Sequence, residues 1–190
     1  MTQDYIAALL GPWAAEWNTG SILLRIVLSV VLASIVGCER SSKRHSAGLR
    51  TFIIVSLAST TAAMVEEYLF DCGRTAPWIT AAVVISTAML SGYSILFSSK
   101  GQIKGLTTSA GLWACGIIGI AIGLGLYTAA LIAYVALLCS LSFFPAFEKY
   151  LKDKSNHFEV HLELKNRSDL GYFTATIRRL GMRIDDIELN

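Results

Sequence analysis

The sequence LTTSAGLWACGIIGIAIGLGLYTAALIAYVALLCSLSFFPAF, residues 106–147, contains no charged side chain over 42 residues. A helix that crosses a membrane needs about 20 consecutive apolar residues. The run is therefore too long for one membrane helix and has the length of two. Its glycine-rich stretch GLGLYT, Gly123–Thr128, is the expected turn between them.

Three further apolar runs precede this one, at Ser21–Cys38, Leu49–Leu69 and Pro77–Phe97. The sequence therefore predicts an α-helical integral membrane protein with a five-span bundle over residues 21–147. The composition agrees, because 54% of the 190 residues are hydrophobic, only 16% are charged, and the mean hydropathy is +0.54. Soluble domains carry about 25% charged residues, so an ordinary soluble enzyme and a disordered chain are excluded. A net charge of +2 is too small to indicate a nucleic-acid partner.

The basic residues predict the orientation in the membrane. Cytoplasmic links of membrane proteins are enriched in Lys and Arg. With five spans, the links on one side contain nine such residues and the opposite links contain only Arg74; the nine are Arg40, Lys43, Arg44, Arg50, Lys100, Lys104, Lys149, Lys152 and Lys154. We therefore expect a multi-pass membrane protein with its N-terminus outside and its C-terminus in the cytoplasm.

Residues 1–20 are expected to lie at the outer membrane surface. They contain Asp4 and Glu16 and lack a basic beginning, which is not typical of a cleaved signal peptide. Trp13 and Trp17 are suited to the interface between lipid and water. The sequence therefore predicts a short interfacial segment before the first span.

The C-terminal residues 156–190 have a different pattern, and residues 148–155 are expected to link them to the bundle. HFEVHLELK alternates between apolar and polar residues, which is typical of a half-buried strand. A helix follows, capped by Asn166 or Ser168 and ended by Gly181, and MRIDDIELN is typical of a second strand. This β-α-β unit is half of a ferredoxin-like fold and too small to be stable alone. We therefore expect a second copy to complete it, which makes the protein a homodimer.

Arg25 lies inside the first predicted span, where an unpaired charge costs about 2.5–3.5 kcal/mol. Arg25 is 13 residues before Cys38, and Glu66 is 16 residues after Arg50. At 1.5 Å per residue the two differ in depth by about 4–5 Å on antiparallel helices. We therefore predict an ion pair of Arg25 with Glu66 or Glu67. The alternative is that Arg25 only extends outward to the membrane surface.

Small and hydroxyl-bearing residues are frequent in the middle spans. Gly116, Gly119 and Gly123 share one face of the fourth span, which favours close helix packing. The alternative is a polar pathway, but no acidic residue lies deep in spans two to five. The four cysteines show no metal-ligand spacing, so neither a metal nor a cofactor is expected.

Three predicted helix ends meet at the cytoplasmic rim: the end of the first span and the beginnings of the second and fourth. Helix N-termini favour anions, and basic residues at this rim would add positive charge, with Glu39 able to hold one of the arginines. The alternatives are a small anion pocket, a docking surface for an acidic partner, and ordinary helix capping by Thr51, Thr107 and Thr108. The residues concerned are Glu39, Arg40, Gly48, Arg50, Thr51, Gly105, Thr107 and Thr108.

The string GCERSSKRHSAGLRT, followed about fifty residues later by GQIKGLTTSAGLWACGIIGIAIGLGLY, resembles the MgtC/SapB family of membrane proteins. The likeness covers roughly residues 21–145. It implies a five-span bundle and points to Glu39, Arg40, Gly48, Leu49, Arg50, Thr51, Gly105, Thr107, Thr108 and Trp113. The chain departs from the family at Ser91–Phe97, where a glycine-rich stretch is usual, and at Ser41, where an acidic residue is usual. Its tail resembles only half of the ACT-like domain that some members carry.

The resemblance implies a role in adaptation to low magnesium, in virulence through survival inside host cells, or in membrane energetics. We therefore expect a non-enzymatic regulator that contacts another membrane complex, such as the proton-driven ATP synthase, through small-residue faces such as Gly119–Gly123. The alternative is a transporter or channel for a small ion or solute, Mg²⁺ included. No catalytic residue is predicted, because no Ser/His pair, His cluster or HExxH motif occurs.

Overall fold

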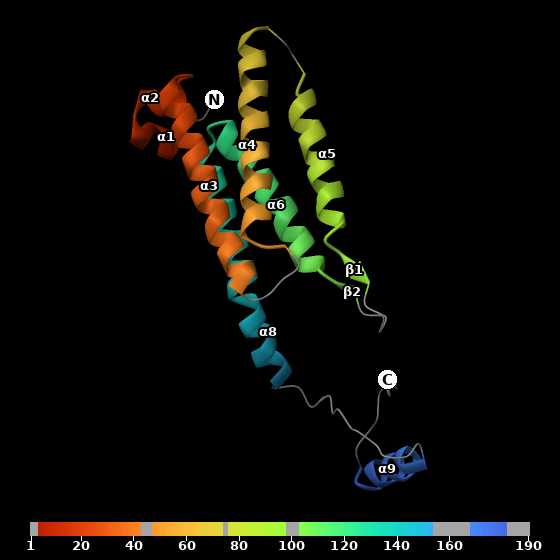
Figure 1. The fold of residues 1–190 in the computed structure, drawn as a ribbon. Helices are drawn as coiled ribbons and strands as arrows, with labels where there is room; N and C mark the ends of the chain where they lie inside the picture. The colour runs from red at the N-terminus through yellow and green to blue at the C-terminus, as the bar shows by residue number, and fades with distance from the viewer. Residues whose placement is uncertain (1–3, 43–46, 74–75, 98–102, 154–167, 182–190) are drawn as a thin grey trace. The chain divides into compact units, whose positions relative to one another are not determined.

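The computed structural model describes residues 4–42, 47–73, 76–97, 103–153 and 168–181 (Figure 1). It divides the chain into two compact units, Met1–Lys149 and Tyr150–Asn190. The first unit holds the apolar helices, and the second holds the C-terminal residues.

Five apolar helices make up most of the first unit, joined in the predicted order. They are α3 (Thr19–Ser42), α4 (Leu49–Asp71), α5 (Trp78–Gly92), α6 (Leu106–Gly123) and α7 (Tyr127–Ser142). Helices α4 and α6 form the central pair (Figure 1). Helix α5 packs against both α4 and α6, α3 packs against α4, and α7 packs against α6. The apolar residues Leu32, Val36, Phe52, Leu112 and Ile122 are buried where these helices meet.

Within the part of the chain that the structure describes, four stretches of helix are long and apolar enough to cross a membrane: α3, α4, α6 and the stretch Tyr127–Glu148. The last of these includes α7 and the beginning of α8 (Phe144–Asp153). The chain is therefore a multi-pass α-helical membrane protein. The turn predicted after Gly123 is present, because α6 ends there and Gly125 adopts a left-handed backbone with φ of 72°.

The third predicted span was extended too far. Helix α5 has 15 residues and ends at Gly92, whereas the apolar run continues to Phe97. The chain turns at Ser94 and Ile95, whose N–H groups donate to Ser91 and Gly92, and then forms the short strand β1 (Leu96–Phe97). Strand β1 pairs antiparallel with β2 (Ile103–Lys104) immediately before α6.

Glycine allows α6 to lie directly against α4. A Cβ atom added at Gly119 would be 2.6 Å from the Ser56 carbonyl oxygen, and one at Gly123 would be 2.5 Å from that of Thr60. Such contacts are far below van der Waals separation, so only glycine fits. This face is therefore occupied within the chain. The expectation that Gly119–Gly123 contacts another complex is wrong.

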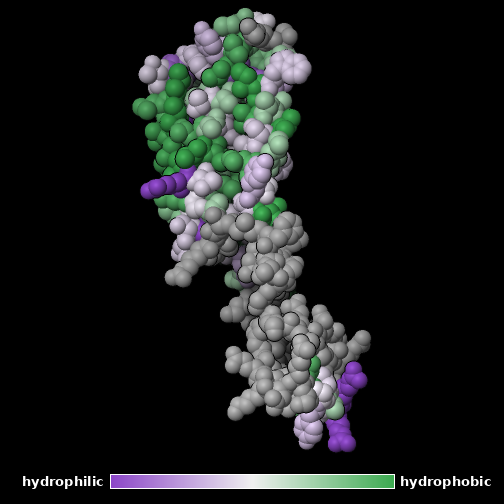
Figure 2. Space-filling view, turned by 45° about the vertical axis from the view of Figure 1, so that its right-hand side comes forward, coloured by the Kyte–Doolittle hydropathy of each residue, from purple (hydrophilic) through white to green (hydrophobic). Residues whose placement is uncertain are grey.

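The outer surface of the bundle is rich in apolar side chains (Figure 2). On α3 they follow every fourth position, with Leu23, Val27, Val31 and Ile35 all exposed. Such a surface is costly in water and favourable in lipid. It agrees with a membrane-embedded bundle.

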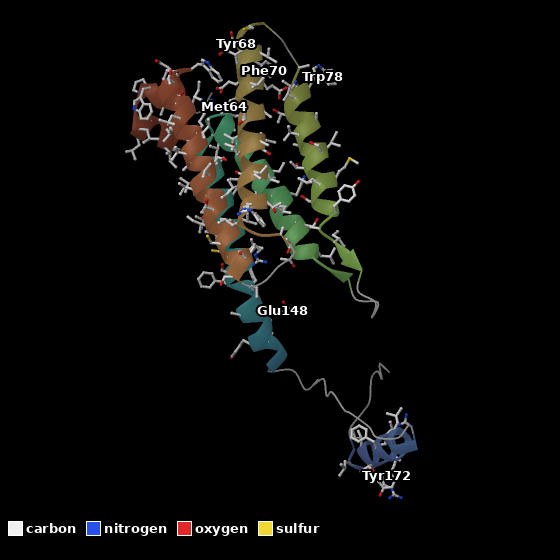
Figure 3. All side chains as sticks on the ribbon, viewed as in Figure 1. Met64, Tyr68, Phe70, Trp78, Glu148 and Tyr172 are labelled. Atoms are coloured by element: carbon white, nitrogen blue, oxygen red, sulfur yellow. The ribbon has the colours of Figure 1, made fainter. Side chains whose placement is uncertain are left out.

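Aromatic side chains gather where α4 joins α5. Figure 3 shows Tyr68 and Phe70 near the end of α4 and Trp78 at the beginning of α5. Trp13 and Trp17, partly exposed, precede α3, and the ring centroids of Trp17 and Tyr68 are 5.8 Å apart. Tyrosine and tryptophan prefer the membrane–water interface, so we assign this end of the bundle, called here the Arg25 end, to one such interface.

The N-terminal segment forms two short helices, α1 (Tyr5–Leu10) and α2 (Pro12–Ala15). Ala7, Ala14 and Tyr127 form a small buried cluster between this segment and α7. The segment therefore covers part of the bundle at the Arg25 end.

In the C-terminal unit the predicted helix is present as α9 (Ser168–Arg179), and Gly181 follows it with φ of 78°. Both strands predicted around it fall outside the described residues, so the β-α-β unit stays a prediction. The segment expected to link the two parts, residues 148–155, is helical as far as Asp153, and the boundary between the two compact units, after Lys149, falls within it.

Candidate functional site

The Arg25 guanidinium joins four parts of the bundle at the Arg25 end. Arg25 is 1% exposed and forms an ion pair with Glu67 of α4. It also donates to the Gly123 carbonyl at 2.8 Å and to the Tyr127 hydroxyl at 3.4 Å. Its guanidinium carbon lies 5.9 Å from the centroid of the Trp17 ring. Arg25 is therefore enclosed by the bundle and does not merely extend to the surface.

The neighbouring carboxylates Glu66 and Glu67 have different tasks. Glu66 is 3% exposed, and its two oxygens accept the N–H groups of Ile79 and Thr80 at 2.7 and 2.9 Å. These groups belong to the first turn of α5, where helix N–H groups have no partner within the helix. Glu67 alone pairs with Arg25, and Glu66 instead ties α4 to α5.

A second chain of hydrogen bonds attaches the N-terminal segment to this site. The Tyr127 hydroxyl, which accepts from Arg25, donates to the Ala14 carbonyl of α2 at 2.9 Å. The Asp4 carboxylate caps α1 and also accepts from the N–H and hydroxyl groups of Thr128 at 2.9 and 2.8 Å. Partial burial opposes ionisation of Asp4, but these bonds outweigh it and lower the pKa of its carboxyl.

Arg40 occupies the corresponding place at the other end of α3, called here the Arg40 end. It is 2% exposed and binds both oxygens of Glu39, at 2.5 and 2.9 Å. It also donates to the Leu141 carbonyl at 2.8 Å, near the end of α7. The prediction that Glu39 holds an arginine in place is therefore correct for Arg40.

Proline explains why the Leu141 carbonyl is available. In a continuous helix this carbonyl would accept the N–H of the residue four positions later. That residue is Pro145, which has no N–H. Arg40 therefore supplies the hydrogen bond that Pro145 cannot. The contact was missed in the sequence analysis, although a proline four residues after Leu141 was its available signal.

The three helix ends expected at the rim do converge at the Arg40 end. A Cβ atom at Gly37 of α3 would lie 2.7 Å from Leu49 Cα, and one at Gly111 of α6 would be in contact with Phe52 of α4 and Leu141 of α7. The capping that was expected there is wrong. Gly48 and Gly105 are the N-cap residues of α4 and α6, and neither provides a side-chain cap.

The remaining rim residues differ in exposure. Arg50, Thr51 and Thr107 are exposed in the first turns of α4 and α6, whereas Thr108 is buried. Gly105 has φ of 97°, and a Cβ there would lie 2.3 Å from the Ser94 carbonyl oxygen. Gly105 therefore serves the tight connection from α5 to α6. Trp113, also implied by the resemblance, is 43% exposed on α6.

The hydroxyl groups in the middle of the bundle bond to one another. The Thr60 hydroxyl donates to the Gly119 carbonyl at 2.9 Å and lies 2.9 Å from the Ser29 hydroxyl, and the Ser29 and Ser56 hydroxyls are also 2.9 Å apart. Together they link α3, α4 and α6. This arrangement favours helix packing over a polar pathway.

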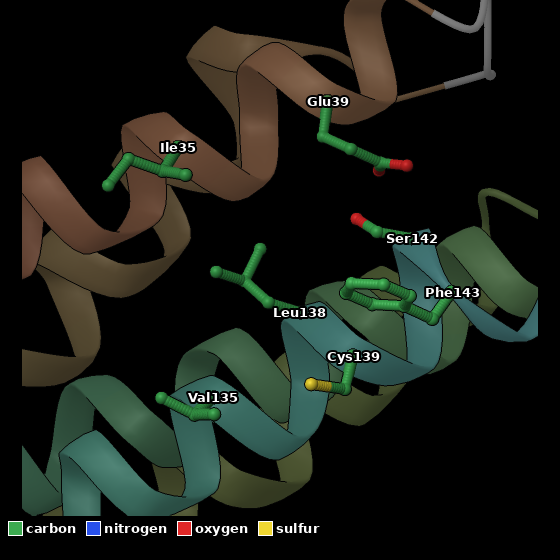
Figure 4. A pocket seen from close by; sticks show the side chains of 7 residues that line it. All are labelled: Ile35, Glu39, Val135, Leu138, Cys139, Ser142 and Phe143. Atoms are coloured by element: carbon green, nitrogen blue, oxygen red, sulfur yellow. The ribbon is translucent and has the colours of Figure 1, made fainter.

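An apolar groove lies between α3 and α7 near the Arg40 end (Figure 4). Its walls are formed by Ile35 from α3 and by Val135, Leu138 and Cys139 from α7. Glu39, Ser142 and Phe143 lie at one end of the groove, so this end is partly polar whereas the rest of the groove is apolar. No sequence pattern indicated this groove.

A family model for the MgtC family matches residues 26–150. The chain belongs to the MgtC family. The matched residues begin one position after Arg25 and include Glu39, Arg40 and the groove.

The chain is similar to bacterial proteins that carry different names. It is 28% identical to the putative magnesium transporter YhiD of Escherichia coli K12, over 76% of this chain and 70% of the relative. It is 25% identical to protein SapB of Bacillus subtilis, over 87% and 78% respectively. It is 30% identical to protein MgtC of Salmonella typhimurium, over 62% of this chain and 50% of the relative. No solved structure matches the chain.

Proposed function

We propose that this MgtC-family protein is a non-enzymatic regulator of the bacterial inner membrane, acting on membrane energetics or in adaptation to low magnesium. In this proposal the Arg40 end faces the cytoplasm and the Arg25 end faces outward. The regulator acts by contact with another membrane complex, and the proton-driven ATP synthase is the first candidate.

The observation that carries the proposal is that the charged side chains within the bundle bind one another or helix ends. Arg25 and Glu67 neutralise each other, Glu66 caps α5, and Arg40 binds Glu39 and a carbonyl. These groups fix helices in place, whereas the apolar outer surface provides area for a partner. A regulator that acts by surface contact needs only helices held in fixed positions and an exposed apolar surface.

The groove between α3 and α7 is the contact surface that we favour. It takes the place of the Gly119–Gly123 face, which is covered within the chain. Ile35 and Val135 are 47% and 52% exposed in it, so an apolar side chain of a partner helix could enter between them.

Site-specific cross-linking tests this contact. A photoreactive residue at Val135 in cells should form a cross-link with an ATP synthase subunit, identified with an antibody against that subunit. The matched control is Ile85, which is 63% exposed on α5 outside the groove. Equal yields at both positions, or no ATP synthase product at Val135, would contradict the proposed partner. Affinity capture with Arg50→Ala would then test whether the rim contributes.

Transport of a small ion is the second candidate, supported by the name of the Escherichia coli relative, a putative magnesium transporter. Purified protein in liposomes loaded with a Mg²⁺ indicator gives the test. Robust flux that Glu39→Ala abolishes would overturn the regulatory proposal. Glu39→Gln keeps the side-chain volume and separates the loss of charge from the loss of packing.

We further propose that residues 156–190 hold two copies together. The exposed face of α9 is consistent with this, since Leu180 next to it is 69% exposed. Gel filtration with light scattering should show a dimer for the full chain and a monomer without residues 156–190. An unchanged oligomer after this deletion would refute the idea.

A further inference from the structure

Helix α5 directs large apolar side chains outward and hydroxyl groups inward. The outward side chains form a row, called here the α5 stripe: Trp78, Ile85, Met89 and Tyr93. At 100° per residue these four positions lie within about 80° of one another around the helix. Thr87 lies about 180° from Trp78 and is buried, as is Ser91, and both hydroxyls donate to carbonyls of α5 itself. This arrangement suits a helix whose outer face meets lipid and not water.

The α5 stripe begins and ends with an aromatic residue that prefers the interface between hydrocarbon and water. Trp78 and Tyr93 are 78% and 80% exposed and lie 15 residues apart. At 1.5 Å per residue, their separation along the helix axis is about 22 Å. The hydrocarbon core of a typical bilayer is about 30 Å thick. An α5 that stands upright in such a bilayer is therefore too short by about 8 Å.

The chain beyond Tyr93 does not lengthen this span. Ser94 and Ile95 turn back onto the end of α5 and lead into β1. Among the described residues β1 and β2 form a sheet of two strands, and no other described element makes extensive contact with them. Open sheet edges that face lipid do not occur within the hydrocarbon region. The two strands therefore belong at the interface, which places the limit of the hydrocarbon near Tyr93.

The opposite side of the bundle has a longer apolar face. Helix α3 lies on the other side of α4 from α5 (Figure 1). Between Thr19 and Glu39 its only charged residue is Arg25, which is buried, so α3 exposes no charge over 20 positions. This length is about 30 Å, the thickness of a typical hydrocarbon core. The apolar surface is therefore full-length on α3 and shortened on α5.

We propose that the α5 stripe binds lipid with short acyl chains and thins the bilayer on that side of the bundle. A helix that is too long for the membrane can tilt, but tilting a short helix reduces its span further. A short helix is accommodated by a thinner bilayer or by association with another helix. The exposed aromatic residues at both ends of the stripe favour thinning, because they anchor it to two lipid–water interfaces. This inference rests on α5 crossing the membrane and not on the regulatory role proposed above.

Lipid competition at a single fluorescent label tests this in the full chain, with the four native cysteines replaced. The label is placed at position 85 in the α5 stripe or, as the matched control, at position 27, since Val27 is 50% exposed on α3. Dibromostearoyl phosphatidylcholine quenches the label, and phosphatidylcholine with myristoleoyl, oleoyl or erucoyl chains competes with it. At position 85 the short myristoleoyl lipid should be enriched about twofold or more over the oleoyl lipid. At position 27 this preference should be absent.

Two results of the competition would overturn the proposal. Equal lipid preferences at positions 85 and 27 would show that the α5 side is not shortened. Weak quenching at position 85 in pure brominated lipid would show that protein, such as a second copy, covers the stripe.

Spin labels at positions 78, 85 and 93 supply a second measurement. Positions 78 and 93 should collide with a water-soluble nickel complex several-fold more often than position 85. Rare collisions at position 93 would place Tyr93 within the hydrocarbon, and frequent collisions at position 85 would show that α5 does not cross the membrane. Either result would refute the thinning without bearing on the contact proposed for the groove.

Discussion

Two arginines of one helix, α3, each bind the carbonyl of another helix end. Arg25 donates to Gly123, the last residue of α6, and Arg40 donates to Leu141 near the end of α7. Carbonyls at helix C-termini lack backbone partners and carry partial negative charge, which favours cations. Both arginines are thus satisfied inside an apolar bundle, and both position other helices relative to α3.

Arg25→Met should lower the stability of the bundle by about 1–3 kcal/mol, because it removes the partner of the partly exposed Glu67 and of the buried Gly123 carbonyl. Thermal unfolding in detergent micelles would measure the loss. Adding Glu67→Gln to this variant should restore part of the stability. The exposed Arg50→Gln serves as control, with a change within about 0.5 kcal/mol. Equal losses for Arg25→Met and Arg50→Gln would contradict the role assigned to Arg25.

Arg40→Met should cost about 1.5–3 kcal/mol through the lost charge-assisted hydrogen bond to Leu141. Pro145→Ala supplies an N–H four residues after Leu141, so it should offset part of that loss when the two changes are combined. A double-mutant cycle of thermal stability measures the coupling. Simple additivity of the two changes would show that Arg40 does not replace the missing backbone donor.

The sequence predicted how deep the site residues lie along their helices, but not which way each side chain points. Counting residues from the shared link placed Arg25 near Glu66 and Glu67. It could not choose between them, because adjacent residues differ by 100° around a helix and the rotation of α4 depends on its packing. The structure directs Glu67 toward Arg25 and Glu66 toward α5.

At the scale of elements, the close contact between α4 and α6 depends on glycine residues, which have no side chain. Gly119→Ala or Gly123→Ala should each destabilise the bundle by about 1–3 kcal/mol, because the new Cβ would meet a backbone carbonyl. Gly92→Ala is the matched control, since a Cβ there would meet no atom within 4 Å. Thermal unfolding of the three variants gives the comparison. Wild-type stability for Gly119→Ala would show that the helices pack less closely than described.

The attachment of α1 to α7 makes a prediction about pH. Asp4→Ala removes the cap of α1 and the bonds from Thr128, and should cost about 1 kcal/mol. Because the pKa of Asp4 is lowered in the folded protein, its contribution is present above its ordinary pKa and is lost as pH falls through the folded value. The protection of the α1 amides from hydrogen exchange, measured relative to the intrinsic exchange rate at each pH, should therefore fall in strongly acidic buffer. In Asp4→Ala this fall in protection should be absent, and its persistence would assign it to another group.

The bounds of the elements were predictable where composition changes and not where geometry decides. Glycine and charge mark the ends of α3, α4 and α6 in the sequence. The apolar residues after Gly92 give no such mark, yet α5 stops there. The chain after α5 passes close to Gly105, where a Cβ would lie 2.3 Å from the Ser94 carbonyl oxygen, so the turn from α5 to α6 needs glycine at that position. Hydropathy alone does not contain that contact.

For the whole molecule, the alternation of helices determines which links share a side of the membrane. Arg25, Glu67, Gly123 and Tyr127 meet at one end of the bundle, and Arg40 and Leu141 meet at the other. Helices α3 and α5 therefore both end at the Arg40 end, and the two sequence links that follow them, with their flanks, contain Arg40, Lys43, Arg44, Arg50, Lys100 and Lys104. By the positive-inside rule we propose that this end faces the cytoplasm.

Cysteines placed singly at positions 43, 104 and 74 test this arrangement in a chain without its native cysteines. A maleimide that does not cross membranes should label positions 43 and 104 only after the inner membrane is opened, and position 74 in intact cells once the outer layers are permeable. Labelling of 43 and 104 from opposite sides would require an odd number of crossings between them. In that case α4 and α5 could not both span the membrane, and the shared rim at the Arg40 end would not exist.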